Sequence, residues 1–258
     1  MPPPPMKAIL VAGGKGSRLL PFTRFTHKTL LPLHRRPVID YALGFIRRAG
    51  IEDITIIANQ FIGQIAQHVG TGLPGESINY VIEEEPKGVG HALQLARPHT
   101  RDARLLIYFS DNITTASFES HLPRFKGDEE ATGCVLLGRR VDNPESFGVG
   151  VFDENKKIVD IIEKPEEPPS DIAIGGIYLY DERFWDFLDD EMERNGDAFT
   201  ISDLNRLYVK SGEATLLDIG AEQWLDCGTP DALLAAAELA KNGVLDPNPC
   251  NMREGDIR

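Results

Sequence analysis

The residues best suited to chemistry stand in a short loop near the start of the chain. Gly13-Gly14-Lys15-Gly16-Ser17-Arg18 directly follows an apolar run at 7–12. Glycines let a backbone approach a ligand closely and point its N–H groups at it. The Ser17 hydroxyl adds a donor and Arg18 adds a permanent positive charge. This combination suits a phosphate chain, although a glycine loop can also be a plain turn.

Two known phosphate-binding loops do not fit this stretch. The P-loop pattern G-x-x-x-x-G-K-[ST] has a different spacing. The dinucleotide fingerprint needs a third glycine where Leu19 stands, which disfavours a nicotinamide-dependent dehydrogenase. The loop therefore requires another explanation.

Alternating strand and helix patterns must position the loop. We expect strands at 7–12, 54–58, 78–82 and 105–109, and helices at 38–48, 61–69 and 88–96. This rhythm predicts an α/β, Rossmann-like fold, with a mostly parallel sheet flanked by helices. Ligands of such sheets lie beyond the carboxyl ends of the strands. The glycine loop and Ser110-Asp111-Asn112 would then share one rim.

The second half of the chain predicts a mixed sheet. We expect strands at 131–138, 148–152, 158–162, 172–180 and 214–219, and helices at 182–188, 201–210 and 230–241. Thr229 would cap the last helix, with Pro230 in its first turn. The simplest organisation is a disordered leader at 1–5, one domain at 6–241 with a mixed-sheet insertion, and a C-terminal tail at 242–258.

Composition bounds the partners and the compartment. The 258 residues carry a formal net charge of −13, which argues against nucleic acid or an anionic membrane as a partner. Apolar runs are of strand length, so no membrane span is expected, and 1–5 lacks the apolar core of a secretory signal. Cys134, Cys227 and Cys250 form neither a CxxC pair nor a disulfide framework, which favours a reducing cytoplasm.

The loop is also the first part of a longer pattern. It comprises GGKGSRLLPFT (13–23), HKTLLP (27–32), RPVIDY (36–41), SDN (110–112), NPESFGV (143–149), IEKP (162–165), GGIYLYD (175–181), ISDLN (201–205) and WLDCGT (224–229). These segments span about 7–239. In this order they resemble the sugar-1-phosphate nucleotidyltransferases, and most closely the glucose-1-phosphate thymidylyltransferases.

The resemblance implies a reaction and its substrates. An NTP, here dTTP, and a sugar 1-phosphate such as glucose 1-phosphate would give an NDP-sugar and pyrophosphate by Mg²⁺-assisted in-line displacement. The sugar phosphate has a second pKa of about 6, so it is already a nucleophile and requires no general base. The family also implies a homo-oligomer.

Five residues take catalytic roles by the same resemblance. Arg18 would hold the β- and γ-phosphates, Lys28 the α-phosphate or the incoming phosphate, and Lys164 the sugar phosphate. Asp111 and Asp226 would bind Mg²⁺, which prefers one or two carboxylates with phosphate and water. Helix capping is the structural alternative for each aspartate.

The resemblance also implies two sets of binding residues. Those for the nucleotide are Ala12, Gly13, Gly14, Gly16, Ser17, Arg18, Glu83 and Gly88. Those for the sugar phosphate are Asn112, Gly148, Glu163, Lys164, Gly176 and Tyr178.

Base recognition is where the chain departs from the pattern. Glu83 stands where thymidylyltransferases of this kind usually carry a glutamine that both accepts from and donates to the pyrimidine. An ionised glutamate only accepts, which suits the two adjacent donors of guanine. The stretch EEEPKG also resembles mannose-1-phosphate guanylyltransferases. The sequence therefore also allows a GTP-using enzyme for a sugar or cyclitol phosphate.

Glu83 and the chain as a whole each allow a simpler interpretation. Glu83 could point into solvent beside Glu84 and Glu85, as acidic runs commonly do. The whole chain could be a non-catalytic nucleotide-sugar sensor. The cations and carboxylates described above disfavour a sensor, because a sensor needs no leaving-group machinery.

Overall fold

The computed structural model describes residues 4–119, 122 and 133–246. Residues 1–3 of the expected leader, 131–132 of an expected strand and 247–258 of the expected tail lie outside the described residues. The division into leader, domain and tail stays a prediction.

The first half of the chain forms the expected parallel sheet. Its strands are β1 (Met6–Ala12), β4 (Asp53–Ala58), β5 (Ser77–Ile82) and β6 (Arg104–Phe109), in the spatial order β6-β1-β4-β5. Neighbouring strands in this group all run parallel. The apolar runs of β1, β4 and β6 are almost fully buried, as a sheet covered on both faces requires, whereas the edge strand β5 is only partly buried.

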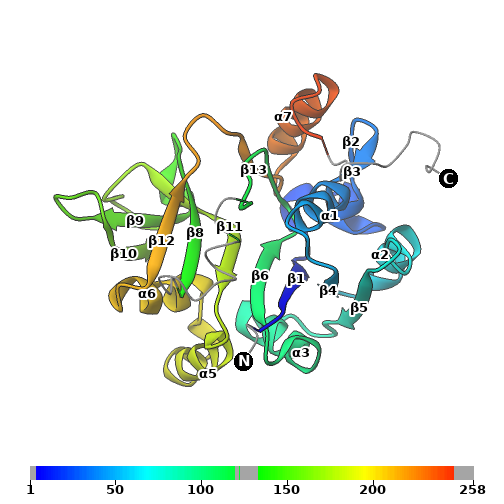
Figure 1. The fold of residues 1–258 in the computed structure, drawn as a ribbon. Coiled ribbons are helices and arrows are strands. Elements are labelled where there is room, and N and C mark those ends of the chain that lie inside the picture. The colour runs from blue at the N-terminus through cyan, green and yellow to red at the C-terminus, as the bar shows by residue number, and fades with distance from the viewer. Residues whose placement is uncertain (1–3, 120–121, 123–132, 247–258) are drawn as a thin grey trace.

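Helices cover the two faces of the sheet. Helices α1 (Val38–Arg48) and α2 (Ile62–Val69) contribute to the apolar core on one face. Helices α3 (Val89–Thr100), α5 (Phe184–Asn195) and α6 (Ile201–Lys210) contribute to the core on the other. The expected doubly covered α/β fold is therefore confirmed (Figure 1).

The second half extends the same sheet. Its strands are β8 (Cys134–Arg140), β9 (Gly148–Phe152), β10 (Ile158–Glu163), β11 (Ile172–Tyr180) and β12 (Ala214–Asp218). Strand β11 runs antiparallel to β6 and so joins these strands to the parallel half, giving nine strands among the described residues. The expected insertion is thus continuous with the main sheet.

Strand β11 divides the sheet at a pair of glycines. Ala173 and Ile174 pair with β9, whereas Ile177–Tyr180 pairs with β6. The register against β8 shifts between Ile174 and Tyr178. Gly175 and Gly176 lie at this shift, and we call these two residues the fork.

The last helix lies apart from the two main helical layers. Helix α7 (Pro230–Lys241) begins as expected, because the Thr229 side chain accepts a hydrogen bond from the Ala232 N–H at 3.3 Å. It packs near the short hairpin of β2 (Pro32–Leu33) and β3 (Arg36–Pro37), and the following Leu245 is buried in the same apolar cluster. None of the helices that the structure describes is long and apolar enough to cross a membrane.

Candidate active site

The loops after β1 and β6 lie side by side at the carboxyl edge of the sheet. The two strands are parallel neighbours, and the Ser110 N–H donates to the Val11 carbonyl at 3.0 Å. Across this edge, Lys28 Nζ lies 2.5 Å from Asp111 Oδ2, and both side chains are largely buried. The expected shared rim is confirmed.

Asp226 reaches the rim through a separate pair of short strands. Strand β13 (Trp224–Asp226) pairs antiparallel with β7 (Asn112–Thr114), placing Asp226 opposite Asn112. The next backbone N–H, that of Cys227, donates to the Asp111 carbonyl at 2.7 Å. Arg18, which is mostly exposed, has its Nη2 3.9 Å from Asp226 Oδ2. Four of the five expected catalytic residues therefore gather here.

The two aspartates differ in their electrostatics. Burial opposes ionisation of Asp111, but the adjacent Lys28 ammonium outweighs it and holds the pKa of Asp111 below its usual value. Burial raises the pKa of Asp226, and the negative charge of Asp111 adds to that rise. An added cation would relieve this repulsion.

The carboxylates of Asp111 and Asp226 suit a divalent cation that also binds phosphate. Carboxylate oxygens are the hard ligands that Mg²⁺ prefers. The described residues contain no group of three or more acidic, histidine or cysteine side chains that could hold a metal alone. Asp111 and Asp226 therefore fit a metal that takes its other ligands from phosphate and water.

A first cavity of about 250 Å³ opens on the glycine-loop side of this cluster. It is lined by Val11, Gly13, Gly14, Lys15, Lys28, Glu83, Pro86, Gly88, Val89, Ala92 and Phe109. Of the residues expected to bind nucleotide, Gly13, Gly14, Glu83 and Gly88 are in this lining. Ala12, Gly16, Ser17 and Arg18 are not, and Ala12 is fully buried.

Glu83 points into this cavity and not into solvent. The residue is only 4% exposed, and a Cβ placed on Gly13 would overlap its carboxylate. Among the residues that the structure describes, no hydrogen-bond donor reaches that carboxylate. Burial raises the pKa of Glu83, with His91 opposing the rise. The solvent-exposed interpretation of Glu83 is wrong, whereas Glu84 and Glu85 are exposed.

A second cavity of about 250 Å³ lies on the other side of the cluster. All six residues expected to bind the sugar phosphate line it: Asn112, Gly148, Glu163, Lys164, Gly176 and Tyr178. Asp111 and Asp226 line it as well. Its further lining residues were not predicted from the sequence: Phe109, Ser146, Phe147, Ile174, Ile201, Ser202 and Trp224.

Asn112 holds the walls of the second cavity together. Its Oδ1 accepts from the Gly176 N–H at 3.0 Å and from Trp224 Nε1 at 2.8 Å. Its Nδ2 donates to Asp111 Oδ1 at 3.2 Å. A Cβ on Gly176 would lie 2.7 Å from that Nδ2, so the fork must be glycine here. One amide N–H of Asn112 is left for a ligand.

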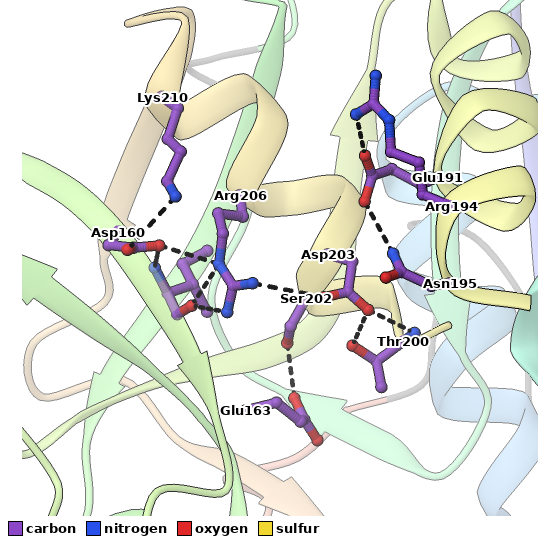
Figure 2. Close-up of polar contacts among 11 residues, drawn as sticks. Asp160, Glu163, Glu191, Arg194, Asn195, Thr200, Ser202, Asp203, Arg206 and Lys210 are labelled. Carbon is purple, nitrogen blue, oxygen red and sulfur yellow. Dashed lines mark hydrogen bonds and ion pairs between the residues drawn. The ribbon is translucent and has the colours of Figure 1, made fainter. Parts of the chain in front are cut away.

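Glu163 is fixed from the opposite side by α6. Ser202 Oγ donates to Glu163 Oε2 at 2.6 Å (Figure 2). Lys164 Nζ lies 3.7 Å from Glu163 Oε1. The start of α6 is itself held, because the Thr200 N–H and hydroxyl both bond Asp203. Glu163 therefore presents one oxygen to the cavity.

Arg206 fastens α6 to strand β10. Its guanidinium donates to the Ile161 carbonyl at 2.6 Å and forms an ion pair with Asp160 at 3.0 Å (Figure 2). These contacts join α6, the helix that carries Ser202, to the strand that ends at Glu163. The lysine next to Glu163 is much freer, since the Lys164 side chain is 65% exposed.

The two cavities meet at the Lys28–Asp111 ion pair. Lys28 lines the first cavity, Asp111 lines the second, and Phe109 lines both. Two anionic ligands placed in the two cavities would therefore face each other across the Lys28–Asp111 pair, with Asp226 and Arg18 beside it. This arrangement suits transfer of a phosphoryl-type group between them.

Comparisons with known proteins agree with this geometry. Residues 7–243 match the family described as nucleotidyl transferase. A glucose-1-phosphate thymidylyltransferase of Neisseria meningitidis is 35% identical over 240 residues, covering 92% of this chain and 83% of that one. One of Xanthomonas campestris is 35% identical over 234 residues, covering 90% and 79%.

Solved structures give the same picture. A Bacillus anthracis protein assigned as a glucose-1-phosphate thymidylyltransferase and complexed with sucrose superposes with a TM-score of 0.85 at 34% identity. The match covers 92% of this chain and 96% of that one. A UDP-glucose pyrophosphorylase complexed with UDP-glucose shares the fold, with a TM-score of 0.79 at 19% identity over 93% and 99% of the two chains.

Proposed function

We propose that this chain, which belongs to the nucleotidyl transferase family of sugar-1-phosphate nucleotidyltransferases, transfers a thymidylyl group from dTTP to glucose 1-phosphate. The relatives described above carry that activity in their names. The observation that carries the proposal is the Lys28–Asp111 pair, which stands between a cavity built on the glycine loop and a cavity built on polar side chains.

The reaction requires no proton transfer by the protein. An oxygen of the sugar phosphate forms a bond to the α-phosphorus of the NTP. The bond from that phosphorus to the bridging oxygen breaks, and its electron pair leaves with pyrophosphate. The chain must bring two polyanions into line and offset their repulsion.

The cations of the site serve this purpose on both sides. Lys28 lies at the junction, where it would meet the α-phosphate, and Arg18 lies beyond it, where it would meet the departing pyrophosphate. Lys164 is exposed at the edge of the second cavity and can reach the phosphate of the sugar. Glu163 Oε1 and the remaining N–H of Asn112 would bond sugar hydroxyls.

Asp111 and Asp226 would hold Mg²⁺. The metal would neutralise phosphate charge and help to align the triphosphate. The raised pKa of Asp226 beside Asp111 indicates that these two carboxylates repel each other without a cation between them.

A matrix of substrates tests the proposal. dTTP, UTP, GTP, ATP and CTP are each combined with glucose, galactose and mannose 1-phosphates, with and without Mg²⁺, and pyrophosphate release is measured. We expect turnover with dTTP and glucose 1-phosphate that disappears without Mg²⁺. Absence of pyrophosphate release in every combination would contradict enzymatic activity and would favour the alternative of a non-catalytic nucleotide-sugar sensor.

One observation favours a second candidate, a GTP-using enzyme. The Glu83 carboxylate is buried in the nucleotide cavity without a donor among the described residues. Guanine offers N1–H and an amino group side by side, whereas thymine offers a single donor next to two acceptors. An ionised Glu83 is therefore complementary to guanine.

Glu83→Gln decides between the two candidates, with the exposed Glu84→Gln as the matched control. For a GTP-using enzyme, the wild type prefers GTP, and Glu83→Gln shifts the ratio of kcat/KM towards dTTP by about tenfold or more. For a dTTP-using enzyme, the wild type already prefers dTTP. Glu84→Gln should leave the ratio unchanged in both cases.

We also propose a reducing cytoplasmic setting. Cys134 and Cys227 are buried free thiols. The homo-oligomer stays a prediction, which light scattering of the purified chain can measure.

A further inference from the structure

A buried histidine directly precedes Lys28. His27 is 1% exposed, and its role is not evident from the sequence, where histidines show no ligand spacing. Its Nδ1 accepts from the Thr29 N–H at 3.2 Å and lies 2.7 Å from the Thr29 hydroxyl. Because Nδ1 is an acceptor, the ring proton is on Nε2, which donates to the Ala12 carbonyl at 2.6 Å.

These bonds join two segments of the nucleotide cavity. Ala12 is the last residue of β1, immediately before Gly13 and Gly14. His27 is the N-cap of the short helical turn η3 (Lys28–Leu30), which carries Lys28. The imidazole therefore links the strand that leads into the glycine loop to the turn that carries the lysine.

Lys28 fits closely against the glycine loop at this junction. A Cβ on Gly14 would lie 2.9 Å from Lys28 Nζ, and a Cβ on Gly16 would lie 3.2 Å from Lys28 Cβ. Thr23 Oγ1 donates to the Gly16 carbonyl at 2.7 Å and holds the far side of the loop. A small shift of η3 relative to β1 would thus move the ammonium within the cavity.

We propose that His27 is a positioning residue that sets Lys28 against the glycine loop, and through it against the α-phosphate of the nucleotide. This inference rests on the proposed function for the role of Lys28. An apolar side chain could fill the same space but could not bond both segments. Burial lowers the pKa of His27 to about 4, so the ring is neutral at neutral pH and keeps both bonds.

Two substitutions separate the two bonds of the ring. In His27→Asn the amide oxygen can still cap the Thr29 N–H, but the side chain is too short for the Ala12 carbonyl. In His27→Gln the longer amide can still donate to Ala12. We expect kcat to fall up to about 100-fold in His27→Asn, with both KM values nearly unchanged, and to be largely restored in His27→Gln.

A double-mutant cycle with Lys28→Met tests whether the effect passes through the lysine. If His27 acts by placing Lys28, then His27→Asn should cost less than about twofold in kcat when Lys28 is already methionine. His68→Gln is the control. His68 Nε2 lies 2.6 Å from Asp40 Oδ1 and joins α2 to α1, and neither residue lines either cavity. It should leave kcat unchanged.

Several outcomes would overturn the inference. The first is a folded His27→Asn enzyme with wild-type kcat. The second is a fall in kcat from His27→Asn that is as large in the Lys28→Met background as in the wild type. The third is a kcat in His27→Gln that is no higher than in His27→Asn. Circular dichroism establishes folding for each variant.

Failure of the proposed function would look different, since the wild type would then turn over no substrate pair. In that case the inference is tested by the NMR chemical shift of the Lys28 ammonium, whose signal is assigned by its loss in Lys28→Met. A shift in His27→Asn that reverts in His27→Gln supports the inference, and an unchanged signal contradicts it.

Discussion

The two cavities on either side of the Lys28–Asp111 pair are built on different principles. The polar side chains of the sugar-side cavity are tied to one another, as Asn112 is to Trp224 and Glu163 is to Ser202. The nucleotide-side cavity offers glycine backbone and the Glu83 carboxylate, which has no donor among the described residues. One side is organised before its ligand arrives, and the other is completed by its ligand.

The largest expected effect is at the boundary that both cavities share. Asp111→Asn and Asp226→Asn should each lower kcat about 1,000-fold, because each removes a charged ligand for the metal. Pyrophosphate release measures the effect, and circular dichroism checks the fold. Asp218→Asn, at the exposed end of β12, is the control. Near-normal turnover in both variants would refute the metal assignment.

Adding a methyl group to each cavity should affect one substrate at a time. Gly13→Ala would press on Glu83 and raise the KM of the nucleotide about tenfold, whereas Gly176→Ala would press on Asn112 and raise that of the sugar phosphate. Gly63→Ala in α2 has open space at the new Cβ and should change neither. Steady-state kinetics in both substrates measures this. Equal effects on both KM values would erase the distinction between the cavities.

The free energy of unfolding should depend on the charge of Glu83, the carboxylate in the nucleotide-side cavity that has no hydrogen-bond donor among the described residues. The pKa of Glu83 is raised in the folded chain, so folding favours the protonated carboxyl. This stabilisation is fully present below the pKa of the unfolded chain and is lost as the pH rises through the pKa of the folded chain. Glu83→Gln should therefore stabilise the chain by about 1 kcal/mol at pH 8 and by nothing at pH 3. Urea unfolding at the two pH values measures the difference. Glu84→Gln, which is exposed, should be neutral, and a destabilised Glu83→Gln at pH 8 would contradict the expectation.

The smallest effect is expected where the sugar-side cavity loses one bond. Ser202→Ala leaves Glu163 without its hydroxyl donor, so the carboxylate is less well oriented. The KM of the sugar phosphate should rise about fivefold, corresponding to about 1 kcal/mol, while the KM of the nucleotide stays the same. Ser77→Ala on β5 is the matched control. A change confined to the nucleotide KM would be the contrary result.

The sequence predicts best what local signals decide. The helices at 38–48, 201–210 and 230–241 match the structure end to end, because proline or threonine marks each start. Helix α5 extends further than expected, to Asn195, since its acidic second half carries no break before Gly196. Asp111 and the glycine loop were expected together because parallel neighbouring strands end at one edge.

The residues that were not predicted depend on contacts between distant segments. Trp224 meets Asn112 across 112 positions, and Ser202 meets Glu163 across 39. His27 reaches Ala12 through a turn whose path no periodic pattern reveals. Side-chain type alone does not say which of these groups will face each other, because register and helix placement decide it.

The fork in β11 leaves the hairpin of β9 and β10 with few pairings to the rest of the sheet. Within the described residues, strand β10 pairs only with β9, and β9 joins the rest of the sheet through Ala173 and Ile174 alone. Gly148 and Glu163, at the ends of this hairpin, both line the sugar-side cavity. A lineage, or a protein engineer, can therefore rebuild the hairpin to admit a different sugar while the parallel strands under the triphosphate keep their register.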